Sequence, residues 1–155
     1  MRLTHRIATM MVALAAVLGG LLLTGAAADA APAAPLTLKL VAHQVTTKAG
    51  CTYYYNDAYW SDGTWAGYAK WSQDPCDTNG DPGDALAASD VYGDGYGINA
   101  HLSTGRTATT AGHNAPYTSP WKTGNLTEDQ TYLMWACAEK GGVEYACTDG
   151  TYVSS

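Results

Sequence analysis

The chain of 155 residues carries 14 acidic and 8 basic side chains, a formal net charge of −6, four cysteines, 11 tyrosines, five tryptophans and no phenylalanine. This length allows one domain of ordinary size and hardly two. The negative charge argues against a nucleic-acid-binding protein, because phosphates attract basic surfaces. The sequence has neither the repeats of collagen nor the heptads of a coiled coil.

Residues 1–30 have the pattern of an export signal. Arg2 and Arg6 precede an uncharged apolar run over residues 7–23, and Ala28-Asp29-Ala30 fits the site that a signal peptidase cleaves, after Ala30 or after Ala28. A membrane anchor is the alternative, because the run approaches the about 20 residues that cross a bilayer. The small residues beside it favour export, and the lack of an arginine pair favours the general secretory (Sec) route. We therefore expect a secreted, extracellular protein whose mature form is not in the membrane.

The remaining part, residues 31–155, has six basic and thirteen acidic side chains and a net charge of −7. Leucine, valine and isoleucine together number only thirteen there, whereas tyrosine and tryptophan number sixteen. Each of these rings can bury about 150–250 Å², so we expect a core built largely from aromatic side chains. All four cysteines lie in this part, and an oxidising export route predicts two disulfide bonds.

The first segments of this part are typical of short strands separated by turns. After a mobile lead over residues 31–35, residues 36–40 alternate apolar and polar side chains as a half-buried strand does, and residues 46–50 form a turn. Residues 51–60 favour a strand, residues 61–63 a tight turn, and residues 64–71 the returning strand. The spacing of three between Trp65, Tyr68 and Trp71 leaves one or two helical turns as the alternative.

The middle of the chain continues this pattern. Residues 73–84 form the clearest loop, and residues 113–120 form another. Residues 85–92 and 96–102 flank Gly93-Asp94-Gly95, which predicts a hairpin. The sequence therefore predicts an all-β fold: a single antiparallel β-sandwich-like domain with two disulfides over residues 36–155, preceded by a signal helix over residues 1–30.

Near the carboxyl end, the stretch GNLTEDQTYLMWACA over residues 124–138 resembles the E–F corner and F strand of fibronectin type III and immunoglobulin-like sandwiches. In those domains a leucine precedes the corner tyrosine by six residues, as Leu126 precedes Tyr132 here. The resemblance implies that the Tyr132 hydroxyl bonds back to the backbone of residues 125–128. Alternation then turns Tyr132, Met134 and Ala136 toward the core and Leu133, Trp135 and Cys137 toward the other side. The antibody-type cysteine pair with a tryptophan between is absent.

The cysteines of this stretch flank a turn. Gly141-Gly142 lies midway between Cys137 and Cys147, so a hairpin centred there places the two cysteines opposite each other, within reach of a disulfide, and Tyr132 opposite Tyr152. Four cysteines allow three pairings. The hairpin favours Cys137–Cys147, which leaves Cys51–Cys76 to tie the acidic loop to the first aromatic strand.

The acidic loop suggests calcium, because hard cations prefer clustered oxygen ligands. Asp77, Asn79 and Asp81 fall at the first, third and fifth places of the EF-hand pattern, but Pro82 and Ala88 stand where glycine and glutamate are required. An EF-hand is thus excluded, and an irregular calcium site that includes Asp84 competes with a solvated turn. No cofactor is expected, and the histidines lack the short spacing of a zinc site.

Three function classes remain. His101, His113 and Glu128 are candidates for acid–base catalysis in a small hydrolase, and an exposed Cys76 segment suits a protease inhibitor. The tryptophans Trp60, Trp65 and Trp71, with Tyr53, Tyr54, Tyr55 and Tyr59, could form a platform on which sugar rings stack, as in carbohydrate-binding modules, or could simply fill the core. Trp135 is either covered by another segment or exposed for binding.

The whole segment after the export signal, above all residues 83–126, also looks like small secreted proteins of actinobacteria without an assigned function. That resemblance implies export and a β fold and no particular activity. The expected function is therefore an extracellular binding protein for a glycan or protein ligand, with the hydrolase and the protease inhibitor as alternatives.

Overall fold

The computed structural model describes residues 36–47 and 50–155, so the export signal over residues 1–30 and the lead over residues 31–35 lie outside the described residues. The described part contains strands and no helix, and hence no helix that could cross a membrane. The strands are β1 (Leu38–Thr46), β2 (Thr52–Trp60), β3 (Trp65–Ser72), β4 (Ala85–Asp90), β5 (Gly97–Leu102), β6 (Thr107–Thr109), β7 (Tyr117–Thr118), β8 (Thr131–Lys140), β9 (Val143–Cys147) and β10 (Thr151–Ser154).

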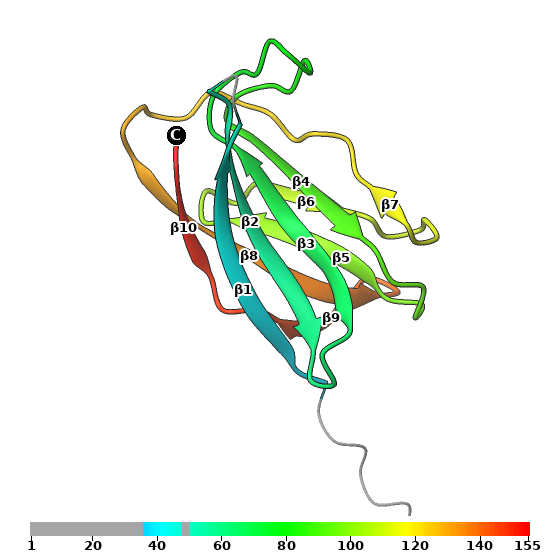
Figure 1. Ribbon diagram of the computed structural model, residues 1–155. Coiled ribbons are helices and arrows are strands. Elements are labelled where there is room, and N and C mark those ends of the chain that lie inside the picture. The colour runs from blue at the N-terminus through cyan, green and yellow to red at the C-terminus, as the bar shows by residue number, and fades with distance from the viewer. Residues whose placement is uncertain (1–35, 48–49) are drawn as a thin grey trace, which may run out of the picture. The chain divides into compact units, whose positions relative to one another are not determined.

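These strands form two antiparallel sheets that face each other (Figure 1). The first sheet has the order β1-β2-β3-β4-β7, and the second has the order β10-β8-β5-β6, with β9 also paired to β8. The all-β, sandwich-like fold predicted from the alternating pattern is thereby confirmed. The segment at residues 65–72 is a strand, so the helical alternative for it is wrong.

The predicted hairpin around Gly93-Asp94-Gly95 is wrong. β4 pairs with β3 and β7 in the first sheet, whereas β5 pairs with β6 and β8 in the second, so this turn carries the chain from one sheet to the other. Asp94 holds the crossing in place: one carboxylate oxygen accepts the Trp60 indole N–H at 2.7 Å, and the other accepts the Tyr96 amide at 2.9 Å. A glycine-rich turn bends the chain, but the partners of its strands are set by packing.

The core between the sheets is not built largely from aromatic rings, contrary to the expectation from composition. Only Tyr53 and Trp71 among the tyrosines and tryptophans are buried. The main cluster instead combines Trp71 with alanines and with Leu86, Ile98, Leu102, Met134 and Val153. Small side chains allow close approach: a Cβ on Gly67 would lie 2.1 Å from the Ser89 carbonyl oxygen. Most of the rings must therefore lie at the margins or on the outer faces.

Two side chains of the first sheet also bond to the second. Asn56, which is fully buried, donates from Nδ2 to the carbonyls of Met134 and Asp149 at 3.1 and 3.0 Å and accepts the Thr148 hydroxyl at 2.7 Å. The Trp71 indole donates to the Ser154 carbonyl at 2.8 Å. Because buried polar groups are costly when unpaired, these bonds fix how the two sheets meet.

Both predicted disulfides are confirmed. Cys51 pairs with Cys76, and Cys137 pairs with Cys147, whose Cα atoms lie 4.0 Å apart as direct partners on β8 and β9. Tyr152, however, lies opposite Leu133 and not opposite Tyr132, so that part of the predicted register is wrong. The chain leaves the hairpin after Cys147 and returns as β10, a separate strand, which can therefore adopt its own register.

The inward face of β8 is as predicted. Met134 and Ala136 are fully buried in the core, and Tyr132 and Leu126 pack against its edge. The hydrogen bond expected from the Tyr132 hydroxyl to the backbone of residues 125–128 is not among those that the described residues make.

Candidate binding face

The outer face of the first sheet carries a group of aromatic side chains. Along β2, Tyr54, Ala58 and Trp60 contact the core, so the alternate residues point outward. The outward residues of β1, β2 and β3 enclose a shallow hollow of about 360 Å³, and its lining is His43, Tyr55, Asp57, Tyr59, Trp65 and Tyr68. We call this set the aromatic face.

Strand register places Asp57 at the centre of the aromatic face. Asp57 lies opposite Val41 of β1 and Tyr68 of β3, with Tyr55 and Tyr59 two residues before and after it along β2. His43 of β1 lies opposite Tyr55, and Trp65 of β3 lies opposite Tyr59. The carboxylate is thus surrounded by rings on neighbouring strands.

A β-bulge explains how Trp65 and Tyr68, three residues apart, share this face. The register between β2 and β3 shifts at Ala58 and Tyr59, so that Gly67 pairs with Ala58 and Trp65 with Tyr59. The extra residue on the β3 side restores the outward direction of Trp65. The spacing of three, which in the sequence left helical turns open, is therefore the result of a bulged strand.

Four rings of the aromatic face, those of His43, Tyr55, Tyr68 and Trp65, contact one another in a continuous row. His43 stacks on Tyr55 with centroids 4.7 Å apart and planes 4° apart, and Tyr55 meets Tyr68 edge-on at 5.6 Å. Tyr68 stacks on Trp65 at 5.8 Å and 16°. Trp65 is 42% exposed, and the other rings are partly exposed, so the row presents ring surface to solvent.

Asp57 lies beneath these rings and is only 6% exposed. Burial raises the pKa of its carboxyl above the usual range, an effect that His43 and a side-chain hydrogen bond from Trp65 partly oppose. His43 Nδ1 lies 3.1 Å from Asp57 Oδ2. Burial, reinforced by the neighbouring Tyr68, also raises the pKa of the Tyr55 phenol to about 12. The face therefore combines apolar ring surface with one buried hydrogen-bonding group.

Beside the hollow, the ammonium group of Lys70 on β3 lies among aromatic rings. Its Nζ is 4.1 Å from the centre of the Tyr53 ring, 4.9 Å from that of Trp121 and 5.9 Å from that of Tyr55. Asp81 Oδ2 lies 3.6 Å away. An ammonium group is thus held by a carboxylate and the faces of three rings.

Of the predicted calcium ligands, Asn79 and Asp81 lie together, with Asn79 Nδ2 3.0 Å from Asp81 Oδ2, but their polar atoms are used within the protein. Both oxygens of Asp81 accept protein hydrogen bonds, from Tyr53 and Asn79 on one side and from Trp121 on the other. Asp84 is turned away and accepts the Leu126 amide at 2.7 Å. Within the described residues, no group of three or more histidine, cysteine or acidic side chains close enough to share a metal ion contains Asp77, Asp81 or Asp84. Asp81 thus fixes the loop to Tyr53 and Lys70 of the first sheet.

The four tryptophans predicted to bind ligand lie in different environments. Trp71 is fully buried, whereas Trp60 is partly buried, packs against the core edge and donates its indole N–H to Asp94. Trp65 belongs to the aromatic face. Trp135 lies on β8 of the second sheet, where it stacks on His101 at 5.1 Å and is partly covered.

The predicted hydrolase residues are also separated. His101, His113 and Glu128 line three different hollows. His101 instead has Glu144 Oε1 at 2.6 Å, and Asn99 donates to the same oxygen at 2.9 Å. Cys137 is near this pair, but its sulfur belongs to the disulfide and is not free to bind a metal.

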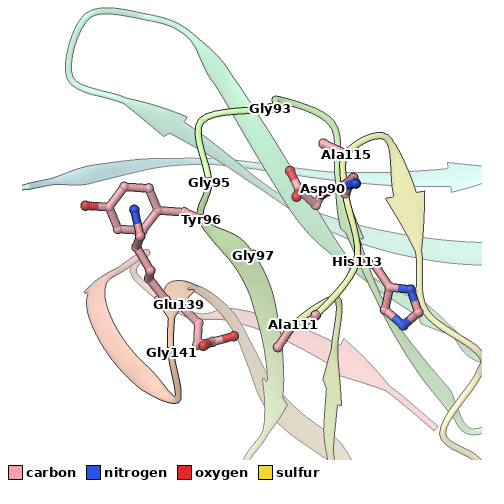
Figure 2. Close-up of a pocket in the computed structure, with 13 residues that line it drawn as sticks. Asp90, Gly93, Gly95, Tyr96, Gly97, Ala111, His113, Ala115, Glu139 and Gly141 are labelled. Atoms are coloured by element: carbon pink, nitrogen blue, oxygen red, sulfur yellow. The ribbon is translucent and has the colours of Figure 1, made fainter.

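A larger hollow of about 600 Å³ lies where β5 begins (Figure 2). Figure 2 shows Asp90 and Glu139 at opposite ends of it, and each carboxylate accepts one bond from a nearby backbone amide. Much of the remaining wall is glycine backbone. The Tyr96 ring has Lys140 Nζ 5.1 Å from its centre, so one ring face is already used. This hollow therefore lacks the open ring surface of the aromatic face.

No protein-family model, curated protein or solved structure matches this chain. Sequence reasoning missed Asp57, His43, Tyr68 and Glu144. The alternation of Tyr53, Tyr55, Asp57 and Tyr59 was available as a signal for the first of these, because residues two apart share one face of a strand.

Proposed function

We propose that this protein is a secreted extracellular binding protein and that the aromatic face of its first sheet binds a glycan. The pattern of residues 1–30 and the two disulfides support export. A protein ligand is the alternative that the experiment below must distinguish.

One observation carries the proposal: the chain leaves Tyr55, Tyr59, Trp65 and Tyr68 at the surface although it is short of apolar side chains for its core. An exposed group of apolar rings marks an interaction site. Sugar rings have flat C–H faces that stack on aromatic rings and hydroxyls that bond to carboxylates. The hollow offers both, with ring surface around the Asp57 carboxylate.

The hydrolase alternative receives less support, because His101, His113 and Glu128 lie apart. The inhibitor alternative retains an exposed loop over residues 77–80 beside the Cys51–Cys76 disulfide. That loop is small, whereas the aromatic face offers several rings to a ligand.

The test is binding of the purified secreted protein to an array of glycans and, separately, to immobilised extracellular proteins. We expect glycan binding, and we expect Trp65→Ala to weaken it by about tenfold or more, because Trp65 is the most exposed of the tyrosines and tryptophans of the face. Tyr152→Ala is the matched control: Tyr152 is 71% exposed but lies on the second sheet. Binding to proteins only, or equal loss in both variants, would contradict the proposal.

A further inference from the structure

Lys70, which lies beside the aromatic face, shows how the first sheet binds an ammonium group. Rings of Tyr53, Tyr55 and Trp121 surround Nζ, and the Asp81 carboxylate balances its charge. A ring face carries partial negative charge and attracts a cation, more strongly where water is partly excluded. The Lys70 side chain is 18% exposed, so this ammonium is largely withdrawn from water.

The neighbouring hollow repeats this arrangement without an ammonium of the chain. The buried carboxylate is Asp57, the rings around it are Tyr55, Tyr59, Trp65 and Tyr68, and Tyr55 contributes to both places. Within residues 36–47 and 50–155, the only ion-pair partner of Asp57 is His43. Lys39 lies opposite Tyr59 on the same face but makes no ion pair with Asp57.

A buried carboxylate without a full positive partner is unfavourable. Asp57 is 6% exposed, and its nearest cationic candidate is an imidazole whose side chain is 44% exposed. A cation entering the hollow would gain both the carboxylate and the ring faces. An anionic ligand would be repelled by both, and a neutral hydroxyl would gain only a hydrogen bond.

We propose that the hollow above Asp57 is a seat for a protonated amine, and that the glycan bound by this protein is an amino sugar polymer with free amino groups. This inference rests on the proposed glycan binding. The amine lies over Asp57 among the four rings, and the sugar ring that bears it stacks on Trp65 and Tyr68, the end of the row of rings described above. A lysine side chain would fill the ammonium seat but would leave that row uncovered, which favours the sugar.

The experiment compares three β-1,4-linked tetrasaccharides that differ only at C2 of each ring: glucosamine, N-acetylglucosamine and glucose. Calorimetric titration at neutral pH should show that the glucosamine tetramer binds at least about tenfold more tightly than the other two. Raising the salt concentration from about 0.05 to about 0.5 M should reduce this preference, because salt screens charge interactions. Nα-acetyl-lysine amide serves as an amine without a sugar ring.

Variants assign the effect to the hollow. Asp57→Asn keeps the shape and removes the charge, so the preference for glucosamine should fall to about threefold or less while binding of the glucose tetramer persists. Asp62→Asn is the matched control, since Asp62 is an exposed carboxylate in the turn between β2 and β3. His43→Ala removes the competing partner of Asp57 and should keep or increase the preference, which provides a test if Asp57→Asn fails to fold.

The outcomes are distinct. Equal binding of the three tetramers, or a preference that survives Asp57→Asn, overturns the amine seat and leaves glycan binding intact. Loss of the preference in His43→Ala overturns it as well. Nα-acetyl-lysine amide binding as tightly as the glucosamine tetramer overturns the assignment to a sugar. Binding of none of the glycans by the unaltered protein overturns the proposed function itself.

Discussion

At the scale of single residues, the aromatic face is unusual because polar and apolar groups are interleaved. Asp57 and the Tyr55 phenol are each partly withdrawn from water, and burial is the main cause of the raised pKa of both. Burial favours the neutral form of an acid. The ionisation of these groups therefore reports directly on whether the face is packed as described.

Tyr55 provides the test at this scale. Its pKa of about 12 in the folded protein exceeds the ordinary value of 10.0. The neutral phenol consequently stabilises the folded chain below pH about 10, and this stabilisation is lost as the pH rises through about 12. We expect the difference in tyrosinate absorbance between the unaltered protein and Tyr55→Phe to titrate near pH 12.

The control for this titration is the same pair of proteins unfolded in urea, where the Tyr55 phenol is returned to water and its ordinary value of 10.0 applies. The difference curve of the folded pair should therefore lie at higher pH than that of the unfolded pair. Coincident curves for the folded and unfolded pairs would show that the Tyr55 ring is freely solvated and that the aromatic face is not packed as described.

At the scale of elements, the two disulfides have different tasks. Cys137–Cys147 joins neighbouring strands β8 and β9, which are already paired, and spans ten residues. Cys51–Cys76 spans 25 residues and holds the loop that contains Asp81 against β2. Asp81 in turn fixes Tyr53, Lys70 and Trp121 beside the aromatic face. Cys51–Cys76 is therefore connected to the binding face, whereas Cys137–Cys147 is not.

Removal of each disulfide separates these tasks. Replacing both cysteines of a pair by alanine should cost about 3 kcal/mol for Cys137–Cys147 and about 3.5 kcal/mol for Cys51–Cys76 on loop length alone. Only the loss of Cys51–Cys76 should also weaken glycan binding, by about threefold or more. Chemical denaturation and calorimetric titration measure the two effects, and a binding loss confined to the Cys137–Cys147 variant would refute this division.

At the scale of the whole molecule, the sheets are aligned by buried polar contacts as well as by apolar packing. The main core is rich in alanine and contains few large apolar side chains, because the chain has few leucine, isoleucine and valine residues. Asn56 compensates by forming three hydrogen bonds with residues of the second sheet and the segment between β9 and β10. Such a group specifies one alignment, since any other would leave it unpaired.

Asn56→Ala tests this alignment. The change removes the Asn56 partner of the Met134 and Asp149 carbonyls and of the Thr148 hydroxyl, and it leaves a gap at a fully buried position. We expect a loss of about 3 kcal/mol or more in the free energy of unfolding. Asn99→Ala is the control, because Asn99 is partly exposed and makes a single bond to Glu144. It should cost about 1 kcal/mol or less. Similar losses in the two variants would mean that Asn56 does not join the sheets.

The sequence by itself determined the features that depend on near neighbours. Alternation along residues 36–40 and 132–138 and the aromatic-rich composition of residues 51–60 predicted strands. The glycine pair at Gly141-Gly142 brought Cys137 to Cys147, because a tight turn leaves few ways to pair the strands that it joins. The pattern of residues 1–30 predicted export, and the four cysteines together with that route predicted two disulfides. These features require no knowledge of the opposite sheet.

Only the tertiary structure decided which face of each strand meets the core. Alternation divides β2 into two faces, but both carry tyrosine, and the choice depends on what packs from the second sheet. There, alanines and Met134 meet Ala58, Ala69 and Trp71 closely, and Asn56 finds its partners, so the opposite face with Asp57 is turned outward. The same packing sent β4 and β5 to different sheets despite their glycine-rich turn. A strand's partners are set by the free energy of burying whole faces, and that quantity is not contained in any single segment.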